Sequence, residues 1–288
     1  MAIDLTPYLS NNAKSMRRSA IRDLLNVANK PEIISFGGGF PNVLTFPVDD
    51  LKQIMAELMD EMPGKLLQYG STEGSVALRK QIAKRYQKEG VNVGIENIII
   101  TTASQQALDL LSRVFLNPGD TVLCGLPSYL GALQAFWSYQ GMPIGIKHDE
   151  EAEAVVSALC AIGKKPKFIY AIPDFQNPSG VTMSLERRKE ILAVARKYDI
   201  LVIEDSPYKE IRFEGESQPT MYSLDPERVI LLGTFSKTFV PGFRLGWVLG
   251  SEQVIEKIIV AKQSADLCTP ILNQELAGRY IASGKFDE

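Results

Sequence analysis

The sequence predicts an α/β fold with a mostly parallel central sheet sandwiched by helices. Two observations carry this prediction. Short apolar segments alternate with helical patterns from about residue 97 to residue 249. Most of these segments are continuous apolar runs, which is typical of strands that are buried on both faces of a sheet. The expected strands are 97–101, 121–124, 143–146, 167–171, 200–204, 229–233 and 244–249.

Helical patterns separate most of the expected strands. Ser184 precedes one of them and is its expected N-cap, because a serine hydroxyl can accept a hydrogen bond from a free N–H of the first turn. A further amphipathic helix carries Leu78, Ile82 and Tyr86 on one face. The expected helices between the strands are 104–116, 129–140, 151–162 and 185–198.

Composition excludes several classes of function. The chain has 288 residues, 45% of them hydrophobic, which is enough for a sizeable core. Its net charge of −3 gives no basic surface for nucleic acid. The three cysteines are far apart and make no ligand spacing with His148, so we expect neither a metal site nor a disulfide framework. No signal peptide and no membrane-spanning run is recognised, and the expected compartment is the cytoplasm.

The N-terminal region offers two weaker signals. Residues 15–28 have an apolar stripe and three arginines, among them Arg22, on an expected helix. This helix is either a solvated amphipathic helix or an arm that lays arginines over a site. The three glycines that end at Gly39 follow a short strand and would let the backbone approach a ligand, although an ordinary turn explains them equally well.

Polar side chains follow five of the predicted strands. Ligands of open α/β sheets bind beyond the carboxyl ends of the strands, so these side chains are candidates for one site. Each of them alone also has a simple structural explanation as a helix cap, a turn residue or a packing residue. They are Ser104 and Gln105 after the first strand, Tyr129 after the second, Asn177 after the fourth, Asp205 and Tyr208 after the fifth, and Thr234, Ser236 and Lys237 after the sixth, with Arg244 beginning the seventh.

The segment 233–246 carries the most specific chemistry. Hydroxyl groups and a guanidinium group are phosphate ligands, and a lysine can form a Schiff base with an aldehyde. A carboxylate at a strand end, such as Asp205, can pair with a pyridinium nitrogen. Together these groups suggest pyridoxal 5′-phosphate (PLP). A surface lysine in a Gly/Pro loop is the simpler interpretation of Ser236 and Lys237 taken alone.

This segment resembles the corresponding block of the class I/II aminotransferases of PLP fold type I. The resemblance implies that Lys237 is the Schiff-base lysine and the general base of the proton shift. It also implies a homodimer, because Tyr69 matches a tyrosine that binds the cofactor phosphate in the active site of the other subunit. The implied phosphate ligands are Ser104, Gln105, Thr234, Ser236 and Arg244, the ring-stacking residue is Tyr129, the partners of the ring hydroxyl are Asn177 and Tyr208, and the partner of the ring nitrogen is Asp205.

Three further segments are similar to the 2-aminoadipate/kynurenine aminotransferase branch: 21–25, 34–41 and 263–274. This similarity implies that Arg22 binds the distal carboxylate of a dicarboxylic substrate and that Gly39 and Asn177 contact the substrate. The expected reaction moves an amino group between 2-aminoadipate, glutamate or a similar amino acid and a 2-oxo acid. The expected division is an N-terminal arm and substrate-side segment, 1–44, and a PLP-binding large domain, 45–288.

The family continues beyond the position of Glu288 into a small C-terminal domain with the arginine that grips the substrate α-carboxylate. We therefore expect residues 1–288 alone to bind PLP without normal turnover, as a PLP-binding remnant would. Another fold type I reaction, such as elimination or decarboxylation, uses the same ring-binding residues. The effector half of a MocR-like regulator is a further alternative, but it needs a winged helix-turn-helix domain, for which residues 1–21 leave too little room.

Overall fold

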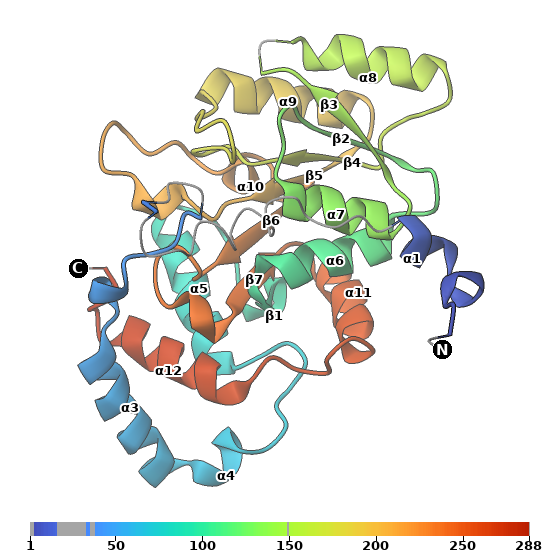
Figure 1. Cartoon of the computed structure of the whole chain (residues 1–288). Coiled ribbons are helices and arrows are strands. Elements are labelled where there is room, and N and C mark those ends of the chain that lie inside the picture. The colour runs from blue at the N-terminus through green and yellow to red at the C-terminus, as the bar shows by residue number, and fades with distance from the viewer. Residues whose placement is uncertain (1–2, 16–32, 35–37, 149, 288) are drawn as a thin grey trace.

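One seven-stranded sheet organises the structure. The computed structural model describes residues 3–15, 33–34, 38–148 and 150–287, and helices cover both faces of the sheet within these ranges (Figure 1). The strand order is β1-β7-β6-β5-β4-β2-β3. Strand β7 is antiparallel to β1 and β6, and the remaining neighbours are parallel. The prediction of a mostly parallel sheet is therefore confirmed.

Every predicted strand is present, and each of its bounds lies within one residue of the predicted bound. Continuous apolar runs were sufficient to find them because each strand is covered on both sides. The strands are β1 (Ile98–Thr102), β2 (Thr121–Gly125), β3 (Met142–Ile146), β4 (Phe168–Ala171), β5 (Leu201–Asp205), β6 (Val229–Thr234) and β7 (Leu245–Leu249).

The predicted helices are also present. Ser184 is the N-cap of α9, since its Oγ accepts a hydrogen bond from the Arg187 N–H at 3.2 Å. The helix expected over 15–28 lies outside the described residues except for Ser15, which ends α1. In the described part of the chain, none of the helices is long and apolar enough to cross a membrane. The helices are α1 (Asn11–Ser15), α3 (Val48–Glu61), α4 (Pro63–Leu66), α5 (Val76–Lys88), α6 (Ala103–Phe115), α7 (Leu130–Ser138), α8 (Ala152–Ala161), α9 (Leu185–Lys197), α10 (Met221–Leu224), α11 (Glu252–Gln263) and α12 (Ile271–Ala282).

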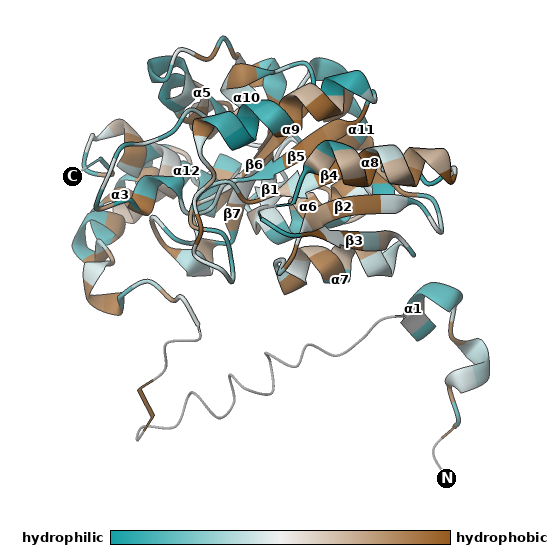
Figure 2. Ribbon diagram, turned by 90° about the horizontal axis from the view of Figure 1, so that it is seen from above, coloured by the Kyte–Doolittle hydropathy of each residue, from teal (hydrophilic) through white to brown (hydrophobic). Residues whose placement is uncertain are grey.

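Alternate residues of most strands belong to two separate hydrophobic cores, one on each face of the sheet. Tyr170 and Ile203 pack with α6, α7 and α11 on one face, whereas Ile169 and Val202 pack with α5, α8, α9, α10 and α12 on the other. Figure 2 shows much of the sheet in the hydrophobic colours. This alternation decides the environment of the strand-end residues, because neighbours in sequence point to opposite faces.

The first turn of α6 lies in close contact with β7. A Cβ atom on Gly246 would lie 2.7 Å from the carbonyl carbon of Ala103 and from the backbone nitrogen of Ser104. Ala103 itself has a φ of 59°, in the left-handed region. Glycine at 246 thus lets the N-terminus of α6 approach the edge of the sheet.

We predict that Gly246→Ala destabilises the protein by about 1–3 kcal/mol, because the clashing atoms are backbone atoms and cannot move cheaply. Urea unfolding measures the change. Gly64→Ala is the matched control, since a Cβ there meets no atom within 4 Å. Equal stability of the two variants would contradict the close contact between α6 and β7.

Glu204 is a fully buried acid at the end of β5. Its Oε2 accepts a hydrogen bond from the Tyr222 N–H at 2.9 Å, and its Oε1 has no partner among the described residues. Burial raises the pKa of Glu204 from 4.5 to about 7. The folded chain therefore keeps this proton at pH values where the unfolded chain has lost it.

We predict that this proton makes stability fall as the pH rises from about 4.5 to about 7, because unfolding then releases the proton. Glu204→Gln removes this loss, so the variant should gain about 3 kcal/mol relative to the parent protein between pH 4.5 and pH 8. Unfolding free energies at the two pH values measure the gain. Glu216→Gln, at an exposed acid, is the control. A pH-independent difference between parent and Glu204→Gln would contradict the prediction.

Candidate active site

The sheet brings its polar strand ends to one edge. Because β7 runs antiparallel to its neighbours, its first residue, Leu245, pairs with Thr102 at the end of β1. In the same way, Gly246 pairs with Thr234 at the end of β6. Arg244, which precedes β7, therefore lies at the edge where β1, β6, β5, β4 and β2 have their carboxyl ends.

A cavity of about 160 Å³ lies at this edge. Most of the cofactor-binding residues predicted from the sequence line it, although they come from separate strand ends. Three further residues, which the sequence reasoning missed, complete the wall: Ala103, Ile172 and Pro207. The predicted residues that line it are Ser104, Gln105, Tyr129, Asp205, Tyr208, Thr234, Ser236, Lys237 and Arg244.

One end of the cavity is suited to an anion. Ser104 and Gln105 belong to the first turn of α6, where free N–H groups and the helix dipole favour negative charge. The Thr234 hydroxyl donates to the Ser236 hydroxyl at 3.0 Å. Arg244 has a φ of 52° and makes no ion pair with any residue that the structure describes, so its guanidinium charge is available to a ligand.

Lys237 places its amine in the same cavity. Its Nζ donates a hydrogen bond to the Gly39 carbonyl oxygen at 2.9 Å. Burial and, second, the charge of Arg244 lower the pKa of Lys237. A larger fraction of neutral amine makes a lysine a better nucleophile toward an aldehyde. Gly39, predicted to contact substrate, has a φ of 55°, and a Cβ atom built on it would lie 3.7 Å from the Lys237 Nζ.

Asp205 presents one free carboxylate oxygen. Its side chain is on the α6 and α7 face of the sheet, opposite to that of Glu204. The Tyr170 hydroxyl donates to Oδ2 at 2.7 Å, whereas Oδ1 is buried and has no partner among the described residues. Burial raises the pKa of Asp205 to about 6. A protonated ring nitrogen entering the cavity would satisfy Oδ1.

Two tyrosines line the cavity, and an asparagine contacts one of them. Tyr208 accepts a hydrogen bond from Asn177 Nδ2 at 3.1 Å, so Asn177 reaches the cavity through Tyr208 without lining it. Tyr129 is the N-cap residue of α7, and its hydroxyl donates to Gln105 Oε1 at 3.4 Å. Burial raises the pKa of both tyrosines, so both hydroxyls keep their protons near neutral pH.

One predicted residue that the structure describes lies away from this cavity. Tyr69 lies between α4 and α5 and is 80% exposed. Arg22 lies outside the described residues. The sequence reasoning also missed Tyr170, because it stands inside an apolar strand, where a tyrosine is normally a packing residue.

The described groups fit PLP on structural grounds. An amine with a lowered pKa suits the aldehyde, a buried carboxylate oxygen without a partner suits the pyridine nitrogen, and a helix N-terminus with hydroxyls and a guanidinium suits the phosphate. The aromatic residue Tyr129 can stack on a flat ring. The cavity therefore offers each part of this cofactor a complementary group.

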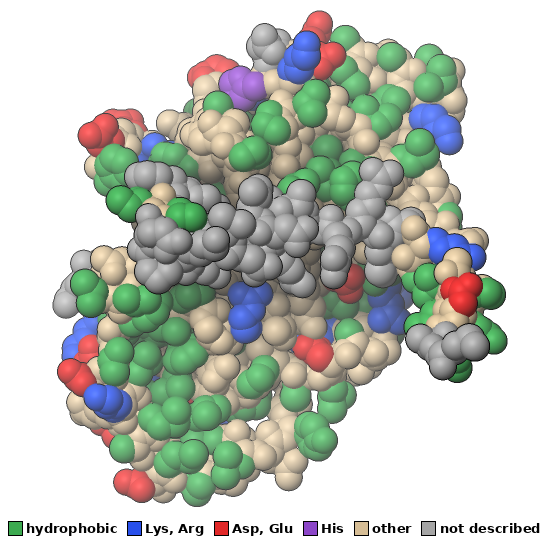
Figure 3. Space-filling view, viewed as in Figure 1, with side chains coloured by type: hydrophobic (Ala, Val, Ile, Leu, Met, Phe, Trp, Pro, Cys, Tyr) green, Lys and Arg blue, Asp and Glu red, His purple; other side chains and the backbone are tan. Residues whose placement is uncertain are grey.

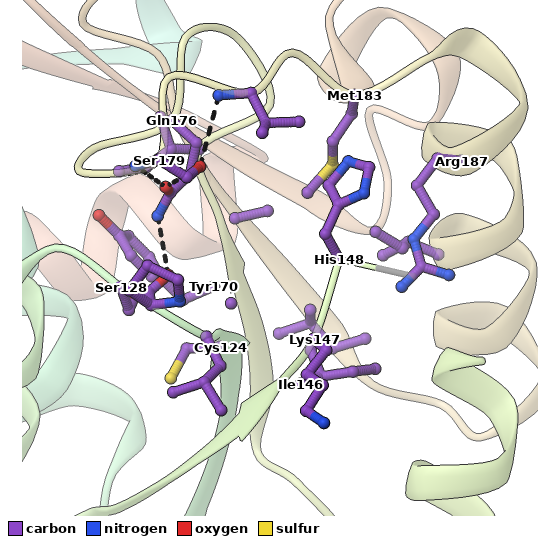
Figure 4. A pocket seen from close by; sticks show the side chains of 18 residues that line it. Cys124, Ser128, Ile146, Lys147, His148, Tyr170, Gln176, Ser179, Met183 and Arg187 are labelled. Carbon is purple, nitrogen blue, oxygen red and sulfur yellow. Dashed lines mark hydrogen bonds between the residues drawn. The ribbon is translucent and has the colours of Figure 1, made fainter. Parts of the chain in front are cut away.

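A second cavity, of about 170 Å³, adjoins the first (Figure 4). Ile172 lines both cavities. The second cavity lies between the ends of β2 and β3 on one side and α9 with the loop before it on the other. Apart from Lys147, His148 and Arg187, its lining residues carry no charge.

Comparison with known proteins extends these observations. A family model described as aminotransferase class I and II matches residues 31–283. The chain is 42% identical to aromatic-amino-acid aminotransferase 1 of Thermococcus litoralis, with 99% of this chain and 70% of that protein covered. It is 38% identical to 2-aminoadipate transaminase of Thermus thermophilus, with 94% of this chain and 68% of that protein covered.

The fold agrees with a solved structure. The crystal structure of Pyrococcus horikoshii kynurenine aminotransferase in complex with PMP superposes with a TM-score of 0.92 at 44% identity, covering 99% of this chain and 72% of that one. The extent of the family match and the identities to named relatives confirm the family predicted from the sequence. The chain therefore belongs to the class I and II aminotransferase family and is a PLP-dependent transaminase.

Proposed function

We propose that the cavity at the strand ends is the PLP site and that the chain transfers an amino group between an acidic amino acid, 2-aminoadipate or glutamate, and a 2-oxo acid. One observation carries the assignment of the site. The Lys237 amine and the unpartnered Oδ1 of Asp205 line one cavity, although Lys237 follows β6 and Asp205 ends β5.

The roles follow from position. When bound, PLP supplies an aldehyde that takes up an amino group and a protonated ring that accepts the electrons of the broken substrate Cα–H bond. Lys237 Nζ would hold the aldehyde carbon of the bound cofactor, and as a free amine it would move the proton of the substrate Cα. Asp205 Oδ1 would keep the ring nitrogen protonated, Tyr129 would stack on the ring, and Asn177 and Tyr208 would hydrogen-bond its hydroxyl. The residues that would hold the phosphate are Ser104, Gln105, Thr234, Ser236 and Arg244.

The acidic substrate is supported by Arg22 and by the relative named for 2-aminoadipate, at 38% identity. An arginine is suited to a distal carboxylate because it offers a planar, permanently charged fork. Gly39 contributes a backbone carbonyl beside Lys237. The competing proposal is an aromatic amino acid as the amino-group donor. It is favoured by the aromatic-amino-acid aminotransferase from Thermococcus litoralis, which is 42% identical to this chain.

We also propose a homodimer in which Tyr69 reaches the phosphate of the partner subunit. Tyr69 is 80% exposed, and the apolar residues Leu44 and Leu67 are 88% and 73% exposed. Figure 3 shows hydrophobic side chains gathered over the part of the molecule where α3 and α12 lie. An exposed apolar surface of this kind is typical of a protein–protein contact.

Two further assignments belong to the same proposal. A cytoplasmic location is supported by three cysteines that form no disulfide. The division into an arm, 1–44, and a PLP-binding domain, 45–288, is supported by the described lining of the cavity, which runs from Ala103 to Arg244 and so falls within the second part. The alternatives are PLP binding without turnover by residues 1–288 and a lyase or decarboxylase reaction.

We predict that the chain, loaded with PLP and then freed of unbound PLP, shows a visible absorbance band and that Lys237→Ala abolishes it, because the covalent link to the lysine keeps the cofactor on the protein. Lys80→Ala, at an exposed lysine of α5, is the control and should keep the band. Absence of the band in the parent protein after addition of PLP would contradict the assignment of the site.

The same spectrum separates the substrate proposals. Addition of 2-aminoadipate or glutamate should convert the band to that of the pyridoxamine form, and addition of 2-oxoglutarate should restore it. A faster conversion by kynurenine or phenylalanine would favour the aromatic donor. A band that no amino acid converts would favour PLP binding without turnover. Loss of the amino group or of the carboxylate from the amino acid, in a reaction to which no oxo acid was added, would favour a lyase or decarboxylase.

We predict that Tyr69→Phe weakens PLP affinity about tenfold, since it removes a hydrogen bond to a charged phosphate. A mixture of Tyr69→Phe and Lys237→Ala chains should regain tight covalent binding, because each mixed dimer then contains one intact shared site. Spectroscopic titration with PLP measures both effects. Unchanged affinity of the Tyr69→Phe protein, or no recovery on mixing, would contradict the shared site.

A further inference from the structure

Tyr170 is a fully enclosed residue that the family assignment leaves without a role. It is 2% exposed, and it lies on β4, on the same face of the sheet as Asp205. In the parallel pairing of β4 and β5, Tyr170 lies opposite Ile203, and Asp205 is two residues farther along β5. The two side chains are therefore diagonal neighbours, within reach of a long aromatic side chain.

The contact between them is polar and specific. The Tyr170 hydroxyl donates to Asp205 Oδ2 at 2.7 Å, which leaves Oδ1 as the oxygen without a described partner. The ring of Tyr170 packs edge-on against Phe136, with centroids 5.5 Å apart. This packing fixes the direction from which the hydroxyl reaches the carboxylate.

Few other groups can act on Asp205. The charged residues that line its cavity are Lys237 and Arg244, and the other titratable residues there are Tyr129 and Tyr208. None of these four makes a hydrogen bond to Asp205 in the structure, whereas Tyr170 does. On its other side Tyr170 borders the second cavity, where Figure 4 shows Lys147, His148 and Arg187 set apart from it across the cavity.

We infer that Tyr170 is a positioning residue: its hydroxyl holds Oδ2 of Asp205 so that the carboxylate stays ionised and turns Oδ1 toward the ring nitrogen of the cofactor. The inference rests on the proposed role of Asp205 in binding that nitrogen. A hydrogen bond to the charged form of an acid stabilises that form, and it opposes the burial that raises the pKa of Asp205.

Tyr170→Phe tests the inference, since it removes the hydroxyl and keeps the ring that packs on Phe136. In the full chain freed of cofactor, carboxyl infrared difference spectra against Asp205→Asn give the pKa of Asp205. We expect Tyr170→Phe to raise this pKa by about one unit. Tyr222→Phe, at a buried tyrosine of the opposite core, should leave it unchanged. An unchanged pKa in Tyr170→Phe would overturn the inference.

The loaded enzyme gives a second readout. We expect Tyr170→Phe to lower kcat about tenfold, with KM changed less than about twofold and the acid limb of the pH profile moved upward. In an Asp205→Asn background the same substitution should have no further effect on kcat. A full additional loss in that background would show a packing role only and overturn the inference.

The two experiments separate the inference from the proposed function. The infrared experiment needs no cofactor. A raised pKa of Asp205 in Tyr170→Phe, together with no PLP band in the parent protein, would therefore support the contact and contradict only the assignment of the site. A normal PLP band and normal turnover with an unshifted pKa would contradict only the role of Tyr170.

Discussion

A buried carboxylate with one hydrogen-bonded oxygen and one open oxygen is the feature on which the site depends. Asp205 is 3% exposed, and burial of a charged group without full compensation costs several kcal/mol. The cost is offset when a cation enters the cavity and meets Oδ1. With a pKa of about 6, this carboxyl group is mostly charged at neutral pH, which suits a partner that itself carries a proton.

The anion-binding end of the cavity rests on a different constraint. Strand β7 runs against the direction of its neighbours, so Arg244 comes to the edge where the other strands end. Gly246, two residues later, lets the first turn of α6 lie against that edge. The backbone at Ala103 and Arg244 is left-handed, at φ values of 59° and 52°, and such conformations persist only where the surrounding structure holds them. Loss of the close contact between α6 and β7 would therefore move the phosphate ligands without touching Asp205.

Much of this architecture could be predicted from the sequence. The strands could be found because buried parallel strands are continuous apolar runs, and most of the site could be found because polar residues follow those runs. Glu204 and Asp205 show the limit of that reasoning. Both are acids at one strand end, and only the alternation of side chains along β5 places Asp205 in the cavity and Glu204 in the opposite core. Tyr170 could not be found, because a hydrogen bond between diagonal neighbours on β4 and β5 depends on the register of the two strands. Ala103, Ile172 and Pro207 also line the cavity, and their residue types carry no chemistry that would mark them in the sequence.

The central claim is that Lys237 and Asp205 bind the two ends of one PLP ring. Borohydride reduction of the PLP-loaded chain, followed by proteolysis and mass spectrometry of the peptides, tests it most directly, because reduction makes a lysine–cofactor link permanent. The account predicts that a single modified residue, Lys237, carries the adduct and that Asp205→Asn lowers its yield. An adduct spread over exposed lysines, or absent from Lys237, would contradict it.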